Sequence, residues 1–202
     1  MHFSLILSLC TFALGVAGQD LSIRAVKKAF RAADVPADLD IVFRPTALLE
    51  VGFPQATGKP IVLHAGVQVP QNDTAGPPTL RVVGDVGRGP FVVSTVDPDA
   101  PTPQDPTMAQ FRHFLGGDFF SRDGLLVNNT PAISDFLQPG PPAGSDAHRY
   151  VFLLFHQSPE FAKQTLVNSA TSRALFNISQ FAAAVDLGKP IAGTFMLVAP
   201  PT

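Results

Sequence analysis

The sequence comprises 202 residues with a formal net charge of −2, from 14 Lys and Arg against 16 Asp and Glu. This near-neutral balance, with no basic run, argues against electrostatic binding of nucleic acid and against stable attachment to an anionic membrane surface. Twenty prolines and sixteen glycines are too many for a helical bundle. Together with abundant Val, Phe, Ile and Leu, they predict a β-rich domain with long loops.

The N-terminus has the pattern of a secretory signal peptide. An apolar run from Phe3 to Val16 is followed by the small residues Ala17 and Gly18. Residues 1–18 are too short for a membrane span, so we expect cleavage there and a secreted single domain over residues 19–202. A retained anchor or a buried N-terminal helix is the alternative. The only cysteine, Cys10, lies in this segment, so the mature chain is expected to have neither disulfide nor thiol chemistry.

Three N-x-S/T sequons begin at Asn72, Asn128 and Asn177. Each alone is a weak signal, but together with the leader they predict a glycosylated, extracellular protein. Asn177 also precedes an expected helix. If its side chain caps that helix, a glycan at this position becomes less favourable.

The first expected element is a basic amphipathic helix over residues 20–35, capped by Asp20 or Ser22 and ended by Pro36. Such a helix can lie on a membrane or a partner, but docking on its own domain is the simpler interpretation. Further helices are expected over residues 159–167 and 177–185. The expected strands are residues 41–43, 48–53, 61–69, 80–86, 91–96, 111–115, 150–155 and 191–198. Two long loops, residues 97–109 and 116–148, are more often functional than idle at this length.

Two polar motifs adjoin the expected central strands. Asp97-Pro98-Asp99-Ala100-Pro101 follows one strand, and residues 140–150, which read GPPAGSDAHRY, lead into another. A second histidine, His113, lies on the short apolar stretch between them. Proline and glycine restrict or free the backbone, so such segments hold side chains at fixed places. Two acids and two histidines at strand ends therefore predict one polar pocket.

Structural roles for these residues are the alternative. An aspartate beside proline often only builds a turn, and a lone histidine on an apolar strand is usually a core residue. Arg149 is expected to brace loops by pairing with a carboxylate. His64 and His156 have no comparable context and are interpreted as structural.

These motifs resemble the two signature regions of the phosphatidylethanolamine-binding protein family. The similar residues are Asp97-Pro98-Asp99-Ala100-Pro101, His113-Phe114, Gly140-Pro141-Pro142 and His148-Arg149-Tyr150. Phe43-Arg44-Pro45 and Pro190-Ile191-Ala192-Gly193-Thr194 extend the resemblance over residues 35–198. The family includes Raf kinase inhibitor proteins, plant flowering regulators and the yeast carboxypeptidase Y inhibitor. The leader and sequons make the chain similar to secreted members, including fungal ones.

The resemblance implies a mainly β (β-rich α+β) fold with a large central antiparallel-rich sheet, a smaller sheet and a few peripheral helices. It also implies a pocket for a small anion, such as phosphate, a phosphorylated headgroup or acetate. The ligand-binding residues would be Asp97, Asp99, His113, Pro141, His148 and Tyr150, with Gly140 at the rim. Two departures are Ser145-Asp146-Ala147, where many members read Thr-Gly-Leu, and the absence of Trp. Some members shape the pocket mouth with a C-terminal helix, whereas this sequence stops at Thr202, so the resemblance does not fix ligand size.

The chemistry expected of such a pocket divides the work between acids and histidines. The aspartates would accept backbone hydrogen bonds or orient the imidazoles, while His113, His148 and the Tyr150 hydroxyl would donate to the anion. Affinity should then fall as pH rises through the histidine pKa.

This predicts a non-enzymatic binding or regulatory protein with no metal or cofactor. A serine carboxypeptidase is the most concrete protein partner that the resemblance implies. The alternative is a secreted hydrolase that uses the Asp and His cluster with a metal or as acid and base, although no nucleophile is evidently paired with a base. Lipid carriage is a third possibility, but the motifs describe a headgroup site and no obvious apolar tunnel.

Overall fold

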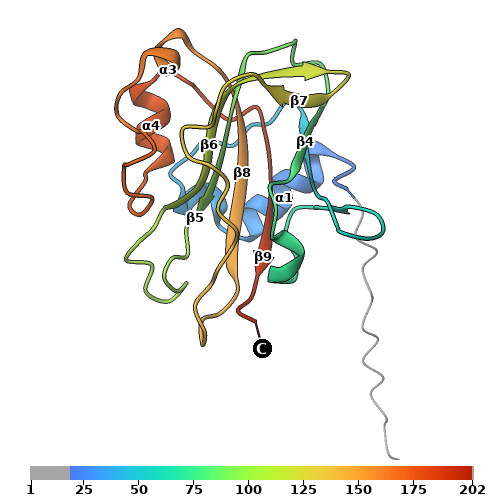
Figure 1. Cartoon of the computed structure of the whole chain (residues 1–202), viewed down its shortest axis with the longest axis vertical. Coiled ribbons are helices and arrows are strands. Elements are labelled where there is room, and N and C mark those ends of the chain that lie inside the picture. The colour runs from blue at the N-terminus through green and yellow to red at the C-terminus, as the bar shows by residue number, and fades with distance from the viewer. Residues whose placement is uncertain (1–18, 202) are drawn as a thin grey trace, which may run out of the picture.

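The computed structural model describes residues 19–201, and the predicted signal peptide over residues 1–18 lies outside them (Figure 1). The described strands form one curled sheet in the order β2-β1-β4-β7-β6-β5-β8-β9-β3. Their bounds are β1 (Leu48–Phe53), β2 (Ile61–Val62), β3 (Val67–Gln68), β4 (Thr79–Val83), β5 (Phe91–Asp97), β6 (Phe111–Arg122), β7 (Leu125–Asn128), β8 (His148–His156) and β9 (Ala192–Val198). The helices are α1 (Ile23–Ala32), α2 (Val35–Asp38), the 3₁₀ helix η1 (Gln71–Thr74), α3 (Pro159–Lys163) and α4 (Ile178–Ala184).

The strand pairing confirms a mainly β fold with a large, mostly antiparallel sheet. Only β3 and β9 pair in parallel among the described strands. The expected smaller sheet is not separate, because β2, β1 and β4 belong to the same sheet and join it through the pairing of β4 with β7, Arg81 with Leu125.

The central strands are buried on both faces. Every residue of β5 is buried, as expected of a central strand that is covered on both faces. One face carries α1 and α4, whose Val26, Phe30 and Phe181 enter one apolar cluster. The opposite face packs Val93 and Phe152 into a second cluster with β1 and β4. Both faces of the sheet therefore contribute to the hydrophobic core.

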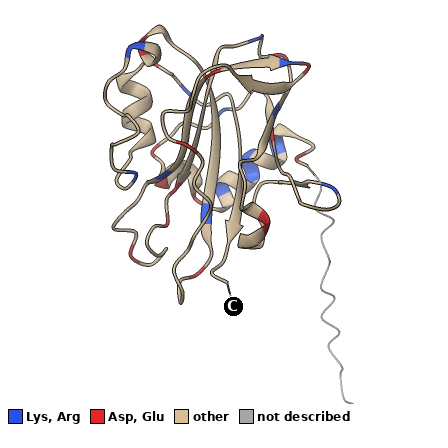
Figure 2. Cartoon of the chain, viewed as in Figure 1, with Lys and Arg blue, Asp and Glu red and all other residues tan. Residues whose placement is uncertain are grey.

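The N-terminal helix differs from the expected one. Ser22 caps α1, accepting a hydrogen bond from the Ala25 amide, and Asp34 in the left-handed conformation ends it before α2. Pro36 lies in the first turn of α2, where proline is tolerated, so it does not terminate the helix as predicted. Asp20 is not a cap: its carboxylate accepts from the Ala65 amide. Figure 2 shows the basic residues of α1, whose apolar side docks on the sheet.

Two predicted strands were wrong. Residues 61–69 do not form one strand, because a turn containing Gly66 at φ +90° divides them into β2 and β3. These short strands lie at opposite edges of the sheet. Residues 41–43 form no strand, and Phe43 instead stacks on Phe30 with ring centroids 4.0 Å apart.

The predicted loop over residues 116–148 begins too early. Strand β6 continues to Arg122 and turns back into β7. Gly117 does not end this strand: a Cβ there would lie 2.4 Å from Cε1 of Phe161, so glycine permits close packing. The remaining loop, residues 129–147, carries part of the site. Among the described residues no helix is long and apolar enough to span a membrane.

Candidate functional site

A cavity of about 360 Å³ lies where β5 ends and where β6 and β8 begin. Because β8 runs antiparallel to β5, the start of one strand adjoins the end of the other. This brings both sequence motifs to one place. The lining residues are Asp97, Ala100, Pro101, Met108, Phe111, His113, Leu137, Gln138, Gly140, Pro142, His148 and Tyr150.

A β-bulge aims His113 at this cavity. Strand β5 pairs Val96 with Arg112 but Thr95 with Phe114, so His113 is the extra residue of β6. A bulge of this kind turns neighbouring side chains toward the same face. His113 consequently lines the cavity beside Tyr150, with ring centroids 4.9 Å apart.

The hydrogen bonding of His113 fixes its tautomer. Its Nδ1 lies 2.9 Å from the carbonyl oxygen of Leu137, which can only accept, so Nδ1 carries a proton. In the neutral ring Nε2 is then an acceptor. Burial lowers the pKa of His113, and the Leu137 hydrogen bond and the Asp97 charge oppose that effect only in part. The ring is therefore neutral near pH 7 and needs a proton to donate from Nε2.

Both ring nitrogens of His148 have protein partners, so the expectation that His148 donates to an anion is not met in this structure. Nδ1 lies 2.9 Å from Oδ2 of Asp97, and Nε2 lies 2.9 Å from Oγ of Ser145. The other carboxylate oxygen of Asp97 accepts the Asp99 amide at 2.7 Å. Asp97 thus orients an imidazole and accepts a backbone hydrogen bond, the two tasks expected of an aspartate here. The Ser145 contact was missed, since the sequence shows no nucleophile paired with a base.

Tyr150 remains a hydrogen-bond donor. Burial raises the pKa of its hydroxyl, the nearby Asp97 charge raises it further, and a hydrogen bond to the Gly140 backbone lowers it. The net effect is a rise, so the phenol keeps its proton throughout the physiological range. It can donate to an anion without titrating.

Two predicted ligand residues do not line the cavity. Asp99 forms a two-pronged ion pair with Arg149, at 2.9 Å from Nε and 2.6 Å from Nη2, and also accepts the Arg149 amide at 2.7 Å. Arg149 further contacts Asp38 at 2.6 Å and the Ala33 carbonyl. Asp99 therefore fixes the start of β8 to the α1–α2 corner, and Arg149 is the brace that was expected. Pro141 is buried beside the cavity, while its neighbour Pro142 lines it.

Other lining residues carried no sequence signal. Met108, Leu137 and Gln138 come from loops, and only their packing in three dimensions brings them to the cavity. Of the residues that the structure describes, no lysine or arginine lines it. Arg173 lies close to His113, where its guanidinium donates to the backbone carbonyls of Arg112 and His113 and its charge lowers the pKa of the His113 ring. Within residues 19–201, no group of three or more His, Cys, Asp or Glu could hold a metal ion.

The sequons have different environments. Asn72 and Asn128 are exposed, on η1 and at the end of β7. The side chain of Asn177 accepts a hydrogen bond from the Gln180 amide, so it caps α4 as the sequence indicates. Asn72 is therefore the best candidate for a glycan, since Nδ2 of Asn128, although exposed, donates to the Thr130 carbonyl.

Comparison with known proteins agrees with the fold and its motifs. The family model described as phosphatidylethanolamine-binding protein matches residues 56–196. The chain is 32% identical over 130 residues to Protein FLOWERING LOCUS T of Arabidopsis thaliana, covering 64% of this chain and 70% of that protein. The chain therefore belongs to the phosphatidylethanolamine-binding protein family.

Solved structures show the same fold at lower identity. The carboxypeptidase Y inhibitor complexed with its cognate proteinase superposes with a TM-score of 0.72 at 19% identity, covering 88% of this chain and 96% of that one. A phosphatidylethanolamine-binding protein from Plasmodium vivax gives a TM-score of 0.68 at 16% identity, covering 86% and 97%.

Proposed function

We propose that this protein is a non-enzymatic binding protein whose cavity takes a small anion, such as phosphate or a phosphorylated headgroup. The observation that supports this is the convergence of Asp97, His113, His148 and Tyr150 on one cavity. Gly140 at its rim lets the backbone approach a ligand. Asp99 and Pro141 support the cavity walls and do not contact the ligand.

Anion binding at this site is coupled to proton uptake. The cavity contains the Asp97 carboxylate and no lysine or arginine, so an anion entering it meets no permanent positive charge. Neutral His113 presents an acceptor lone pair at Nε2. Protonation converts that nitrogen into a charged donor, and a bound anion favours the charged form. Affinity should therefore fall as pH rises from the pKa of free His113, which burial lowers, to the higher pKa of the complex.

Calorimetric titration with sulfate and phosphoethanolamine at pH 5.0 and 8.0 tests this function. Sulfate keeps its charge across this range, so any pH dependence comes from the protein. We expect tighter binding at pH 5.0 with net proton uptake, measured by repeating the titration in buffers of different ionisation enthalpy. His113→Asn, which keeps a donor for Leu137, should remove the proton uptake. Equal affinity at both pH values in folded protein would contradict the proposal.

Secretion and glycosylation belong to the same proposal. They depend on residues 1–18 and on the exposed Asn72 and Asn128. Expression of the full chain in a eukaryotic host should release a product that begins near Gln19 into the medium. Enzymatic removal of N-glycans should lower its mass. Retention of the leader in the mature protein would contradict secretion by this route.

A regulatory role needs a protein partner, and we propose a serine carboxypeptidase for the first test. The fold neighbour named above is described with its proteinase, but 19% identity supports the fold alone. Purified protein should therefore be assayed against a serine carboxypeptidase with a chromogenic substrate. Absence of inhibition at micromolar concentration would exclude this partner while leaving anion binding intact.

A hydrolase is the second candidate, favoured by the chain of contacts from Asp97 through His148 to Ser145. A hydroxyl bonded to an imidazole that a carboxylate orients is the usual arrangement of an activated serine nucleophile. Two contacts argue against this role. The Ser145 hydroxyl donates to the Asp146 carbonyl at 2.9 Å, so its proton is not directed at His148. The Ser145 amide donates to the Pro142 carbonyl, so it is not free to stabilise an oxyanion. Labelling by a fluorophosphonate probe, mapped to Ser145 and absent in Ser145→Ala, would establish the hydrolase and overturn the non-enzymatic assignment.

A further inference from the structure

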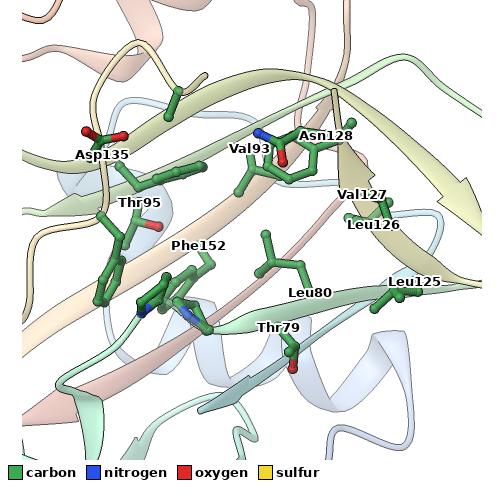
Figure 3. Close-up of a pocket in the computed structure, with 16 residues that line it drawn as sticks. Thr79, Leu80, Val93, Thr95, Leu125, Leu126, Val127, Asn128, Asp135 and Phe152 are labelled. Carbon is green, nitrogen blue, oxygen red and sulfur yellow. The ribbon is translucent and has the colours of Figure 1, made fainter. Parts of the chain in front are cut away.

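A second and larger hollow adjoins the anion cavity. It is an open groove of about 590 Å³ between β4, β7 and the loop over residues 132–136 (Figure 3). Its walls are predominantly apolar and include the rings of Phe114, Phe119, Phe136 and Phe152. A hollow of this size and character suits a small apolar ligand. No single segment of the sequence indicates this groove, since its lining comes from five strands and two loops.

The groove and the cavity are consecutive along the same face of the sheet. On β8 the alternate residues His148 and Tyr150 line the cavity, and the next, Phe152, lines the groove. Alternate residues of a strand share one face and lie about 6.6 Å apart. On β5 the order is Asp97 in the cavity and then Thr95 in the groove.

The bulge and one loop complete this continuity. His113 lines the cavity, and Phe114, which the bulge places on the same face, lines the groove. Phe136 and Leu137 are neighbours in the chain, the first lining the groove and the second the cavity. One loop segment is therefore a common wall of both hollows.

The boundary between the hollows holds an unused polar group. The Thr95 hydroxyl is buried and has no hydrogen-bond partner within the described structure. Leaving such a group unsatisfied is costly, so most buried hydroxyls are paired. Thr95 lines the groove, and on β5 it is the residue of this face that follows Asp97 of the cavity, so its hydroxyl is a candidate donor to a ligand atom at this junction. The ester oxygen of an alkyl phosphate is an acceptor of the right kind.

We infer that the two hollows form one site for a single-chain amphiphile, with its anionic head in the cavity and its alkyl chain in the groove. This inference rests on the proposed anion binding at the cavity. Within residues 19–201, the groove is lined by no lysine or arginine and by a single acid, Asp135, which is exposed. The groove therefore disfavours a second anion and accepts an uncharged chain.

The test is a series of monoalkyl phosphates from ethyl to octyl, titrated at pH 5.0 below their micelle-forming concentrations. Each methylene that leaves water should tighten binding about twofold to fourfold, depending on how far the open groove covers it. Ala132→Trp, which fills the groove from its partly exposed loop, should abolish this increase and leave ethyl phosphate affinity unchanged. Octanol, which lacks the anionic head, should bind far more weakly than octyl phosphate.

A matched pair of charge substitutions adds a control. Leu125 and Val83 are both exposed strand residues, at 38% and 43%, but only Leu125 lines the groove. Leu125→Asp should weaken octyl phosphate several-fold, and Val83→Asp should not.

The outcomes separate this inference from the function on which it rests. Ethyl and octyl phosphate of equal affinity would overturn the shared site while retaining anion binding. Failure of every phosphate to bind would overturn both. A third outcome is that octanol and sulfate bind at the same time without competing, while octyl phosphate binds no more tightly than either. That result would show two separate sites and would also overturn the inference.

Discussion

Replacing Asp99 by asparagine should destabilise the protein without weakening anion binding. The Asp99 side chain is only 4% exposed, and that of its partner Arg149 is 18% exposed. Removing one member of a buried pair typically costs about 3–5 kcal/mol because the other charge is left uncompensated. Here Asp38 and the Ala33 carbonyl still contact the guanidinium, so we take the lower end, about 3 kcal/mol. For a domain of this size that lowers Tm by about 6–12 °C.

Asp38→Asn is the matched control, since Asp38 contacts the same guanidinium but its side chain is 42% exposed. An exposed ion pair contributes at most about 1 kcal/mol, so Tm should fall by no more than about 2–4 °C. Calorimetric scans give the two Tm values, and sulfate titration at pH 5.0 gives affinity, which should stay within twofold for both variants. The reasoning is refuted if Asp99→Asn loses no more stability than Asp38→Asn. It is equally refuted if sulfate affinity falls tenfold while Tm is unchanged.

Three further predictions concern single side chains. The pKa of His113 is lowered in the folded protein, so as pH falls below about 6.5 the unfolded chain takes up this proton first and the free energy of unfolding declines. The urea midpoint of His113→Asn should therefore fall less than that of the wild type between pH 7.5 and 5.5, and an equal fall would contradict this. Thr95→Val removes an unpartnered hydroxyl and should raise Tm by about 2–4 °C; a lower Tm would mean that the hydroxyl is paired in solution. Asn177→Ala should cost about 1 kcal/mol by loss of the helix cap, whereas Ser179→Ala, which removes only the sequon, should leave Tm unchanged; equal losses would contradict the capping role.

The central strands and the position of the site could be predicted from the sequence. Strands β5, β8 and β9 are mostly apolar segments bounded by proline, glycine or charged residues. Such segments are expected to be buried strands whichever neighbours they pair with. The two motifs end or begin these strands, so their meeting follows from antiparallel pairing.

The edges of the fold could not be predicted in the same way. Residues 61–69 alternate as a strand should, yet Gly66 turns the chain and sends its halves to opposite edges. Alternation records which side chains face a core and says nothing about where the chain bends. The glycines at the predicted end of the strand over residues 111–115 had the opposite effect. Gly117 makes room for the ring of Phe161, and the strand continues through it.

The individual roles within the motifs also required three-dimensional partners. Asp97 and Asp99 are chemically identical and two residues apart, but His148 lies beside one and Arg149 beside the other. The sequence carries both partners without indicating which carboxylate each one meets. The apolar groove escaped notice for the same reason, since no single segment contains enough of it.

The loop segment between the two hollows is tied directly to His113 through Leu137. Leu137 and His113 bond reciprocally: the Leu137 carbonyl accepts from the imidazole, and the Leu137 amide donates to the His113 carbonyl at 2.9 Å. That first bond is one of the influences that sustain the basicity of the ring. If a ligand in the groove displaced Leu137, this hydrogen bond would be lost and the pKa of His113 would fall further. Binding of the proposed anion, which depends on protonated His113, would then weaken. An alkyl chain too wide for the groove would therefore weaken binding of its own anionic head through His113, a residue that the chain does not contact.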